Sequence, residues 1–339
     1  MMPEAVFLHR DDEVVIVSPA DTPTVHDGTP GLDTLVLEVI GGHLSWGLLS
    51  GQAVPAAVLH DPDATQEWLW AVYGEPVALA VADGRSGELT ATAARPELAY
   101  AARQLGYAYW AAHWWPASTI DGIPALDSEV LGRDIAALTE ACESIVDGAD
   151  AQPSPMGPPS EAIAARRQDY ALAAGAAGPG HTGLALATGT SGWDWRRCPP
   201  GVLDASEFAI SWLLARESGS TSVEVRATAA PHLDAGLPVH LRPRARVVTD
   251  SVATDVALRL TGDTWVGEEL VDAENIVRVD LYVPGVGPAP DETSASENIY
   301  GPRLRQRIRE FVIDRLRSPQ PSMPLLEAER AAAASDTDF

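Results

Sequence analysis

Residues 148–160, in the stretch DGADAQPSPMGPPS (147–160), are so rich in proline that no regular helix or strand is expected to pass through them. Proline fixes one backbone angle and removes a backbone donor, so such a stretch is typical of a semi-rigid linker. The 339-residue chain is long enough for two ordinary domains. We therefore predict one domain on each side of this Pro-rich linker, over residues 1–147 and 161–317.

The N-terminal part alternates between strand-like and helix-like segments, which predicts a mixed α+β domain. Turn-forming residues separate short apolar runs that we interpret as strands, at 5–8, 13–17, 35–40, 76–82 and 88–94. Helical spacing of apolar residues predicts helices over 64–74 and 96–115, with Pro116 ending the second. A further helix opens at Asp127, a residue type that caps helix N-termini well.

The C-terminal part changes character after an expected helix at 161–176. Alternating or apolar runs recur between turn signals and predict strands at 183–190, 207–215, 222–229, 238–248, 256–262 and 276–284. The run at 204–216 is equally compatible with a helix. Regularly spaced strands of this kind are typical of an antiparallel β-sandwich-like domain. We expect a C-terminal helix over 301–317 and a flexible tail over 318–339.

Charge excludes several kinds of partner and chemistry. The chain has 48 acidic residues against 23 basic ones, for a net charge of −25, and every basic residue is arginine. Residues 1–150 carry −18 of that charge and residues 151–339 carry −7. Nucleic acid and anionic membranes need clustered cations, so we expect neither as a partner. Without lysine, a Schiff-base cofactor site and a P-loop nucleotide site are both excluded.

No signal peptide, membrane-length apolar run or metal-ligand motif is visible, so the sequence predicts a cytoplasmic protein without metal or cofactor. Cys142 and Cys198 are too few for a disulfide framework and are expected to be reduced. Histidines recur at intervals of seventeen residues, but the segments between them share no other pattern, which indicates no repeat.

One stretch resembles a catalytic motif. In AAVLHDPDAT (56–65) an apolar strand runs into D-x-D-x-T, the nucleophile motif of haloacid-dehalogenase-type phosphatases. Asp61 would then attack phosphorus and Asp63 would protonate the leaving group, in a metal-assisted reaction. Pro62 would stiffen that loop and the family's basic partner could only be arginine. The alternative interpretation is a strand-end turn in which Asp63 or Thr65 caps the helix at 64–74.

Aromatic clusters and a basic helix are the candidate interaction surfaces. Trp114 and Trp115 are neighbours on a helix and point about 100° apart, so they cannot both face one core. Tryptophan at such an edge suits a protein interface, as Trp193 and Trp195 around Asp194 also would. The helix at 303–317 holds six arginines. Its Arg303 and Arg307 are further candidates for contact with an acidic partner.

Three phrases carry a resemblance to a family of proteins: WWPASTIDGIPALD (114–127), WDWRRCPPGVLDASEFAISW (193–212) and GDTWVGEELV (262–271). Over residues 96–317 the chain resembles actinobacterial proteins associated with systems that contain a MoxR-type ATPase and a von Willebrand A-type protein. The resemblance implies a non-ATPase accessory component of a chaperone-like or conflict-response (defence) machine. It brings no functional residues.

Together these features predict a non-catalytic adaptor or accessory subunit that acts through protein–protein contacts, with an ATPase component as a candidate partner. Two alternatives stay open. The first is a phosphohydrolase that uses Asp61 and Asp63, and the second is a binding module for a small molecule or glycan, for which exposed tryptophans would provide the platform.

Overall fold

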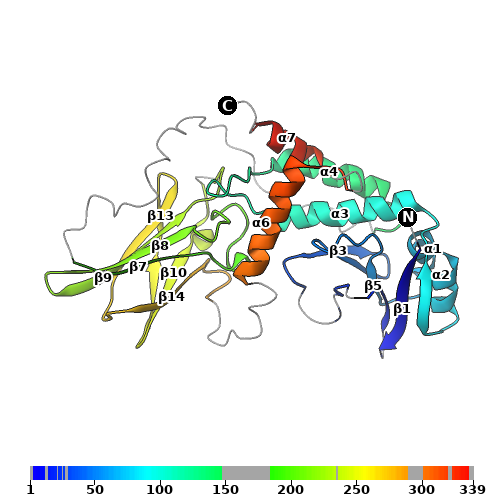
Figure 1. Ribbon diagram of the computed structural model, residues 1–339, viewed down its shortest axis with the longest axis horizontal. Helices are drawn as coiled ribbons and strands as arrows, with labels where there is room; N and C mark the ends of the chain where they lie inside the picture. Colours follow the sequence, from blue (N-terminus) through cyan, green and yellow to red (C-terminus); the bar gives the residue numbers. More distant parts are fainter. Residues whose placement is uncertain are drawn as a thin grey trace. The chain divides into compact units, whose positions relative to one another are not determined.

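The computed structural model describes residues 3–11, 14–20, 22–24, 26, 30–146, 184–233, 236–288, 301–319 and 323–335 (Figure 1). The chain has an α+β fold that divides into two compact units. The first unit comprises Met1–Trp115, Pro124–Ser154 and Ser296–Phe339; the second comprises Pro116–Ile123 and Pro155–Ala295. The predicted linker (148–160) and the predicted helix at 161–176 lie outside the described residues.

The division differs from the predicted one in two places. The C-terminal segment from Ser296 onward belongs to the first unit, whereas the sequence placed the helix at 301–317 in the second domain. Conversely, the short segment Pro116–Ile123 leaves the first unit and joins the second. Both exceptions arise because buried side chains far away in the sequence hold these segments, and sequence spacing cannot reveal such contacts.

The first unit contains a six-stranded antiparallel sheet in the order β3-β4-β5-β2-β1-β6. Its strands are β1 (Glu4–Asp11), β2 (Val14–Ser18), β3 (Thr34–Val39), β4 (Gly42–Gly47), β5 (Ala56–Leu59) and β6 (Gly87–Ala91). Strand β4 was not predicted, because its sequence GHLSWG has neither a strong apolar run nor β-branched residues. It is nevertheless central, paired with β3 and β5, and its Trp46 is fully buried.

The described helices of this unit are α1 (Gln66–Tyr73), α2 (Glu75–Ala82), α3 (Pro96–Trp114), α4 (Ser128–Ala141), α6 (Pro302–Arg317) and α7 (Glu327–Ser335). Helix α3 packs against strand β3 of this sheet, and α4 packs against α3, as the helices of this unit form a layer beside the sheet. Asp127 caps α4 as predicted, since its Oδ1 accepts hydrogen bonds from the backbone N–H groups of Glu129 and Val130 at 2.9 and 3.0 Å. No described helix is long and apolar enough to cross a membrane.

The strand predicted at 76–82 is wrong, because PVALAVA forms helix α2. Gly74 takes a φ of +88°, which suits glycine, and so ends α1 and turns the chain directly into α2. Pro76 then stands in the first turn, where a missing N–H costs nothing. Four buried residues, Val77, Ala78, Ala80 and Val81, follow helical spacing; in a short apolar run this pattern is indistinguishable from a buried strand.

The C-terminal segment is anchored to the first unit by a buried ion pair, so the predicted flexible tail over 318–339 is wrong for residues 323–335. Arg315 of α6 donates to both carboxylate oxygens of Glu329 in α7, from Nε at 2.7 Å and from Nη2 at 2.9 Å. The Tyr107 hydroxyl of α3 donates to Glu329 at 2.7 Å, and the Arg315 guanidinium lies 4.5 Å from the centre of the Tyr107 ring. Glu329 is completely buried.

The remaining donors of this cluster are also used. Arg315 donates to the carbonyls of Met323 and Pro324, and the backbone N–H of Leu326 donates to Glu329 at 2.8 Å. Burial, followed by the charge of Glu329, raises the pKa of Tyr107 well above its usual range, so the hydroxyl stays a donor. A buried ion pair is tolerated when its hydrogen bonds are met in this way.

Glu329→Gln should destabilise the first unit by about 3–5 kcal/mol, because it leaves Arg315 buried without its counter-charge. The free energy of unfolding from urea titration measures this. Glu327→Gln is the matched control in the same helix: Glu327 is exposed and pairs only with Arg330, so we expect little change. Equal effects of the two substitutions would contradict the assigned role of Glu329.

The second unit is a β-sandwich-like domain with two antiparallel sheets, and the chain passes from one sheet to the other (Figure 1). The five-stranded sheet has the order β12-β13-β9-β8-β7 and the three-stranded sheet the order β11-β10-β14. The strands are β7 (Leu184–Ser191), β8 (Ile210–Glu217), β9 (Ser220–Thr228), β10 (Arg244–Thr249), β11 (Ala253–Ala257), β12 (Arg259–Thr261), β13 (Thr264–Leu270) and β14 (Ile276–Tyr282). The ambiguous run at 204–216 contributes strand β8.

A bend at Leu258 carries the chain from one sheet to the other. Strand β11 belongs to the three-stranded sheet, and β12 begins one residue later in the five-stranded sheet. Glycine is required where β13 passes this bend, because a Cβ at Gly267 would lie 2.5 Å from the carbonyl oxygen of Ala257. Strand β13 was not predicted, since this glycine and the polar pair Glu268–Glu269 interrupt its apolar pattern.

Candidate functional site

The predicted interface tryptophans separate into one partly exposed and three buried side chains. Trp115 is 8% exposed, and its Nε1 donates to the carbonyl of Pro124 at 2.8 Å, whereas Trp114 is half-buried. This agrees with the expectation that the two cannot share one core. Trp193 and Trp195 are 6% and 5% exposed. Of the four, only Trp114 therefore presents part of its ring at the surface.

Trp193 belongs to a hydrogen-bonded hub around Asp204, a fully buried residue that sequence reasoning did not single out. One carboxylate oxygen accepts hydrogen bonds from the Ser118 hydroxyl at 2.7 Å and from the Ser206 N–H at 2.9 Å. The other accepts from the N–H of Thr119 at 2.7 Å and from its hydroxyl at 3.0 Å. The Asp204 carbonyl accepts the Trp193 Nε1 donor at 2.7 Å. Asp204 thus holds the segment 116–123 in the second unit.

Asp204→Asn should destabilise the second unit by on the order of 3 kcal/mol, the upper end of the range for hydrogen bonds to a charged group. The amide removes the charge and turns an NH₂ group toward donors that need an acceptor. Thermal unfolding followed by tryptophan fluorescence reports the loss, because Trp193 is part of the hub. Asp272→Asn, at an exposed loop position of the same unit, should leave the transition unchanged.

Asp61 and Asp63 lie on an exposed turn after β5. Asp61 Oδ1 accepts a hydrogen bond from the Ala64 N–H at 3.1 Å, so the residues form the predicted strand-end turn. The predicted cap is wrong, because Thr65 at the N-cap of α1 makes no side-chain capping hydrogen bond. Strand β5 runs antiparallel to both neighbours, β2 and β4. Among the residues that the structure describes, no group of three or more His, Cys, Asp or Glu side chains is placed to hold a metal ion. The turn thus gives Asp61 a structural role, and the phosphohydrolase interpretation of Asp61 and Asp63 stays a hypothesis.

Two histidines that lie seventeen residues apart in the sequence are in contact. His43 on β4 and His60 after β5 lie with their ring nitrogens 3.3 Å apart and their rings perpendicular. Burial lowers the pKa of His43, the Glu38 charge opposes this, and His60 adds to the lowering. The sequence could not reveal this pair, because it depends on the unpredicted strand β4. Two histidines without a third ligand do not form a complete metal site.

Both cysteines are buried and free. Burial raises the pKa of Cys142 to about 12, and burial together with the Asp194 charge raises the pKa of Cys198 further. The thiols therefore stay protonated at neutral pH. A protonated, buried thiol is a poor nucleophile and a poor metal ligand.

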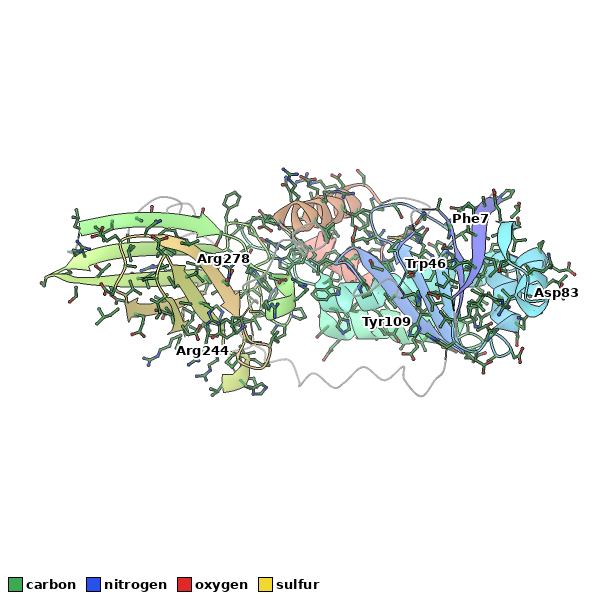
Figure 2. All side chains as sticks on the ribbon, turned by 90° about the horizontal axis from the view of Figure 1, so that it is seen from below. Phe7, Trp46, Asp83, Tyr109, Arg244 and Arg278 are labelled. Atoms are coloured by element: carbon green, nitrogen blue, oxygen red, sulfur yellow. The ribbon has the colours of Figure 1, made fainter. Side chains whose placement is uncertain are left out.

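Three arginines on the outer side of the three-stranded sheet and three more beside its strands make up a cluster that we call the arginine face. It comprises Arg196 and Arg197 of a short 3₁₀ helix (Trp195–Arg197), Arg242 before β10, Arg244 and Arg246 on β10, and Arg278 on β14. Strand pairing places Arg246 between Asp255 on β11 and Asp280 on β14, and Arg244 opposite Tyr282. Figure 2 shows Arg244 and Arg278 on this unit, with further nitrogen-tipped side chains beside Arg244.

The opposite side of the same strands faces the core. Its residues Ala245, Val247, Val279 and Leu281 are buried. Because side chains alternate along a strand, burying this set forces the arginines of β10 and β14 to the outer side. The arginine face is therefore a direct consequence of the alternation in RARVV and VRVDL.

Three carboxylates partly neutralise the arginine face. Asp194 accepts hydrogen bonds from Arg196 Nε at 2.9 Å and Nη2 at 2.6 Å. Arg278 Nε donates to Asp280 at 2.6 Å. Arg246 Nε lies 3.9 Å from Asp255, and within the described residues this buried nitrogen makes no hydrogen bond. Among the described residues of this cluster, six arginines outnumber three aspartates, although the chain as a whole is strongly acidic.

The pKa values of Asp194 and Asp280 move in opposite directions. Burial alone would raise the pKa of Asp194, but hydrogen bonds from Arg196 and the charges of Arg196 and Arg197 outweigh it and lower the pKa. For Asp280, burial dominates over the opposing Arg278 and raises the pKa, and the nearby charge of Asp194 adds to this. The cluster thus stabilises the ionised form of Asp194.

Asp194→Asn should cost about 1.5–3 kcal/mol at neutral pH, as expected for hydrogen bonds to a charged group. The folded pKa of Asp194 is lowered, so its stabilisation is present above the ordinary aspartate pKa and disappears as pH falls through the lowered value. The difference between wild type and variant should therefore vanish in acid. Urea midpoints across pH measure it.

Asp280→Asn is the control of opposite sign. Because the folded pKa of Asp280 is raised, wild type loses stability relative to this variant as pH rises from the ordinary aspartate pKa through the raised one. Parallel pH profiles for the two variants would contradict the assigned electrostatics.

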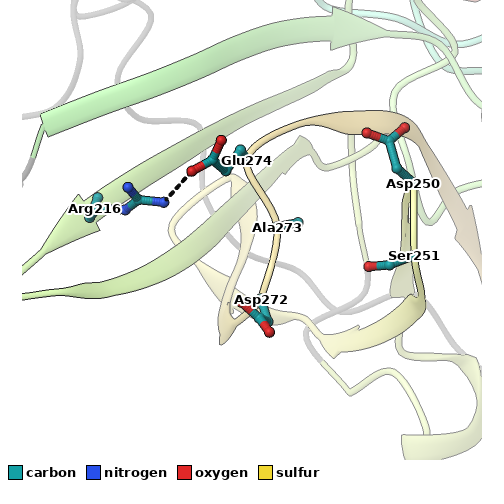
Figure 3. A pocket seen from close by; sticks show the side chains of 6 residues that line it. All are labelled: Arg216, Asp250, Ser251, Asp272, Ala273 and Glu274. Carbon is teal, nitrogen blue, oxygen red and sulfur yellow. Dashed lines mark hydrogen bonds and ion pairs between the residues drawn. The ribbon is translucent and has the colours of Figure 1, made fainter.

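A shallow pocket of about 360 Å³ lies at the loop end of the second unit (Figure 3). Its lining residues are Arg216, Asp250, Ser251, Asp272, Ala273 and Glu274. The single cation of this lining is already engaged, since Arg216 Nη2 lies 3.2 Å from Glu274. The pocket is therefore acidic, in contrast to the arginine face.

The predicted arginine candidates lie on α6 of the first unit. Arg303 and Arg307 are exposed, whereas Arg305, Arg309 and Arg315 of the same helix are buried. Two basic surfaces are thus available for an acidic partner, α6 and the arginine face. Neither known protein families, nor curated proteins, nor solved structures give a significant match to this chain.

Proposed function

We propose that this protein is a non-catalytic accessory subunit that acts through protein–protein contacts, with the arginine face as its main contact surface. The observation that carries the proposal is the concentration of six arginines on and beside the outer side of the three-stranded sheet, in a chain of net charge −25. Arginine is the cation best suited to interfaces, because its planar guanidinium group can donate two hydrogen bonds to one carboxylate and is weakly hydrated.

The arginine face fits an acidic protein surface. Arg242 and Arg244 are exposed, and the three aspartates of the cluster leave cationic charge over. An acidic partner would complete the pairing and would be steered toward this side, while the rest of the chain repels it. Such an arrangement fixes the orientation of the complex.

The partner we propose is an ATPase component of a MoxR and von Willebrand A-type system, in the cytoplasm. The three phrases around residues 114–127, 193–212 and 262–271 support this partner. The first two of them supply the Asp204 hub and part of the arginine face, so the resembling residues coincide with the framework of the proposed surface.

Affinity purification from the native cell, followed by binding measurements with the purified partner, tests the proposal. Arg242→Glu combined with Arg244→Glu should weaken binding about tenfold or more, because an attraction becomes a repulsion. Wild-type affinity should fall with added salt.

The matched control is Arg303→Glu combined with Arg307→Glu, which changes the net charge equally on the other basic surface. Unchanged binding by this control would assign the contact to the arginine face. Loss of binding only in the α6 variant would overturn that assignment, and purification without any stoichiometric partner would overturn the function.

A further inference from the structure

Strand β7 forms one edge of the five-stranded sheet. It pairs with β8 on one side, in antiparallel register from Leu184 opposite Arg216 to Ser191 opposite Ile210. Its residues are exposed or half-buried throughout, and the Leu184 side chain is 70% exposed. An edge strand presents backbone N–H and C=O groups that are suited to pair with another strand.

Soluble proteins usually protect such an edge with charged residues, proline or a very short strand. The other edge of this sheet follows that rule, because β12 is three residues long and begins with Arg259. Strand β7, LALATGTS, is eight residues long and has neither charge nor proline. Its one irregularity is a register shift between Ala185 and Ala187. The two edges of one sheet thus differ sharply.

An apolar side chain lies beside the backbone groups of β7. The Trp212 ring of β8 lies over Gly189, where a Cβ would come within 2.4 Å of the ring. Trp212 is half-buried, so part of its ring remains beside the edge. On the other side of the sheet, Thr188 and Thr190 alternate with Gly189 and are exposed. Paired threonines across two strands are favourable.

Charge identifies the occupant. Two copies of a chain with net charge −25 repel each other at most surfaces. Antiparallel pairing of β7 with β7 places only uncharged side chains opposite one another. It also brings the Leu184 end of each copy toward the Ser191 end of the other copy. A two-fold axis repeats this arrangement at both ends.

We propose that β7 is a self-association surface, at which two copies of this chain pair antiparallel through Leu184–Ser191 and join their five-stranded sheets. The occupant of the edge is a second copy of the chain. The proposal goes beyond the accessory function, because it requires no ATPase and leaves the arginine face free.

Light scattering coupled to size exclusion tests it on the full chain, whose mass is 35.9 kDa. Wild type should have twice that mass. Thr188→Lys should be monomeric, since it puts a charge on the central part of the edge. Thr261→Lys is the matched control: it makes the same change on the β12 edge and should remain dimeric. A monomeric wild type, or a dimeric Thr188→Lys, would overturn the proposal.

Hydrogen exchange keeps the proposal testable if Thr188→Lys fails to fold. In wild type, protection of the β7 amides should increase with protein concentration. Protection that does not depend on concentration would overturn the proposal and would indicate that β7 is covered by its own chain. If wild type is a monomer and a co-purifying protein is lost only from the Thr188→Lys variant, strand β7 pairs instead with a strand of that other protein.

Discussion

Within each of the two units, one buried carboxylate accepts hydrogen bonds from a distant part of the chain and holds that part in place. Asp204 binds Ser118 and Thr119, more than eighty residues earlier in the sequence, and Glu329 binds Tyr107 more than two hundred residues earlier. Each carboxylate is completely buried. Asp204 thus anchors the segment 116–123, and Glu329 anchors the C-terminal helices together with Asp134, which accepts hydrogen bonds from the N–H groups of Glu327 and Ala328.

The absence of lysine shapes both the interior and the surface. Every cation that meets a buried carboxylate has to be arginine, and the Arg315 fork uses its width to bind Glu329 and two carbonyls at once. On the outer side of the three-stranded sheet the same residue type forms an incompletely neutralised surface. Arginine thus supplies the cations of both the buried ion pair and the surface cluster, which differ mainly in burial.

Elements with strong local signals could be predicted from the sequence. The cap of α4 at Asp127, the long helix α3 and the alternating strands β9 and β14 all follow from short-range rules. Helix α2 could not, because a short run of alanine and valine suits either structure and the contacts of the folded unit decide.

The candidate site was harder to predict than the fold. The arginine face depends on the register that sets Arg246 between Asp255 and Asp280, and His43 meets His60 only through the unpredicted β4. Of the predicted tryptophans, Trp193 and Trp195 are buried, and Trp193 donates a hydrogen bond to the carbonyl of Asp204. Such placements depend on pairing between strands, which spacing along one chain does not encode.

The discontinuity of the first unit has a consequence for biosynthesis. Its sheet and helices α1 to α4 are translated first, but α6 and α7 follow only after the whole second unit. Tyr107 therefore leaves the ribosome long before Glu329 and Arg315 exist to bind its hydroxyl and ring. During translation, the second unit can complete its sheets while the first still exposes the surface that α7 later covers. Helices α6 and α7, which are synthesised after the second unit, therefore complete a unit whose sheet is synthesised before it.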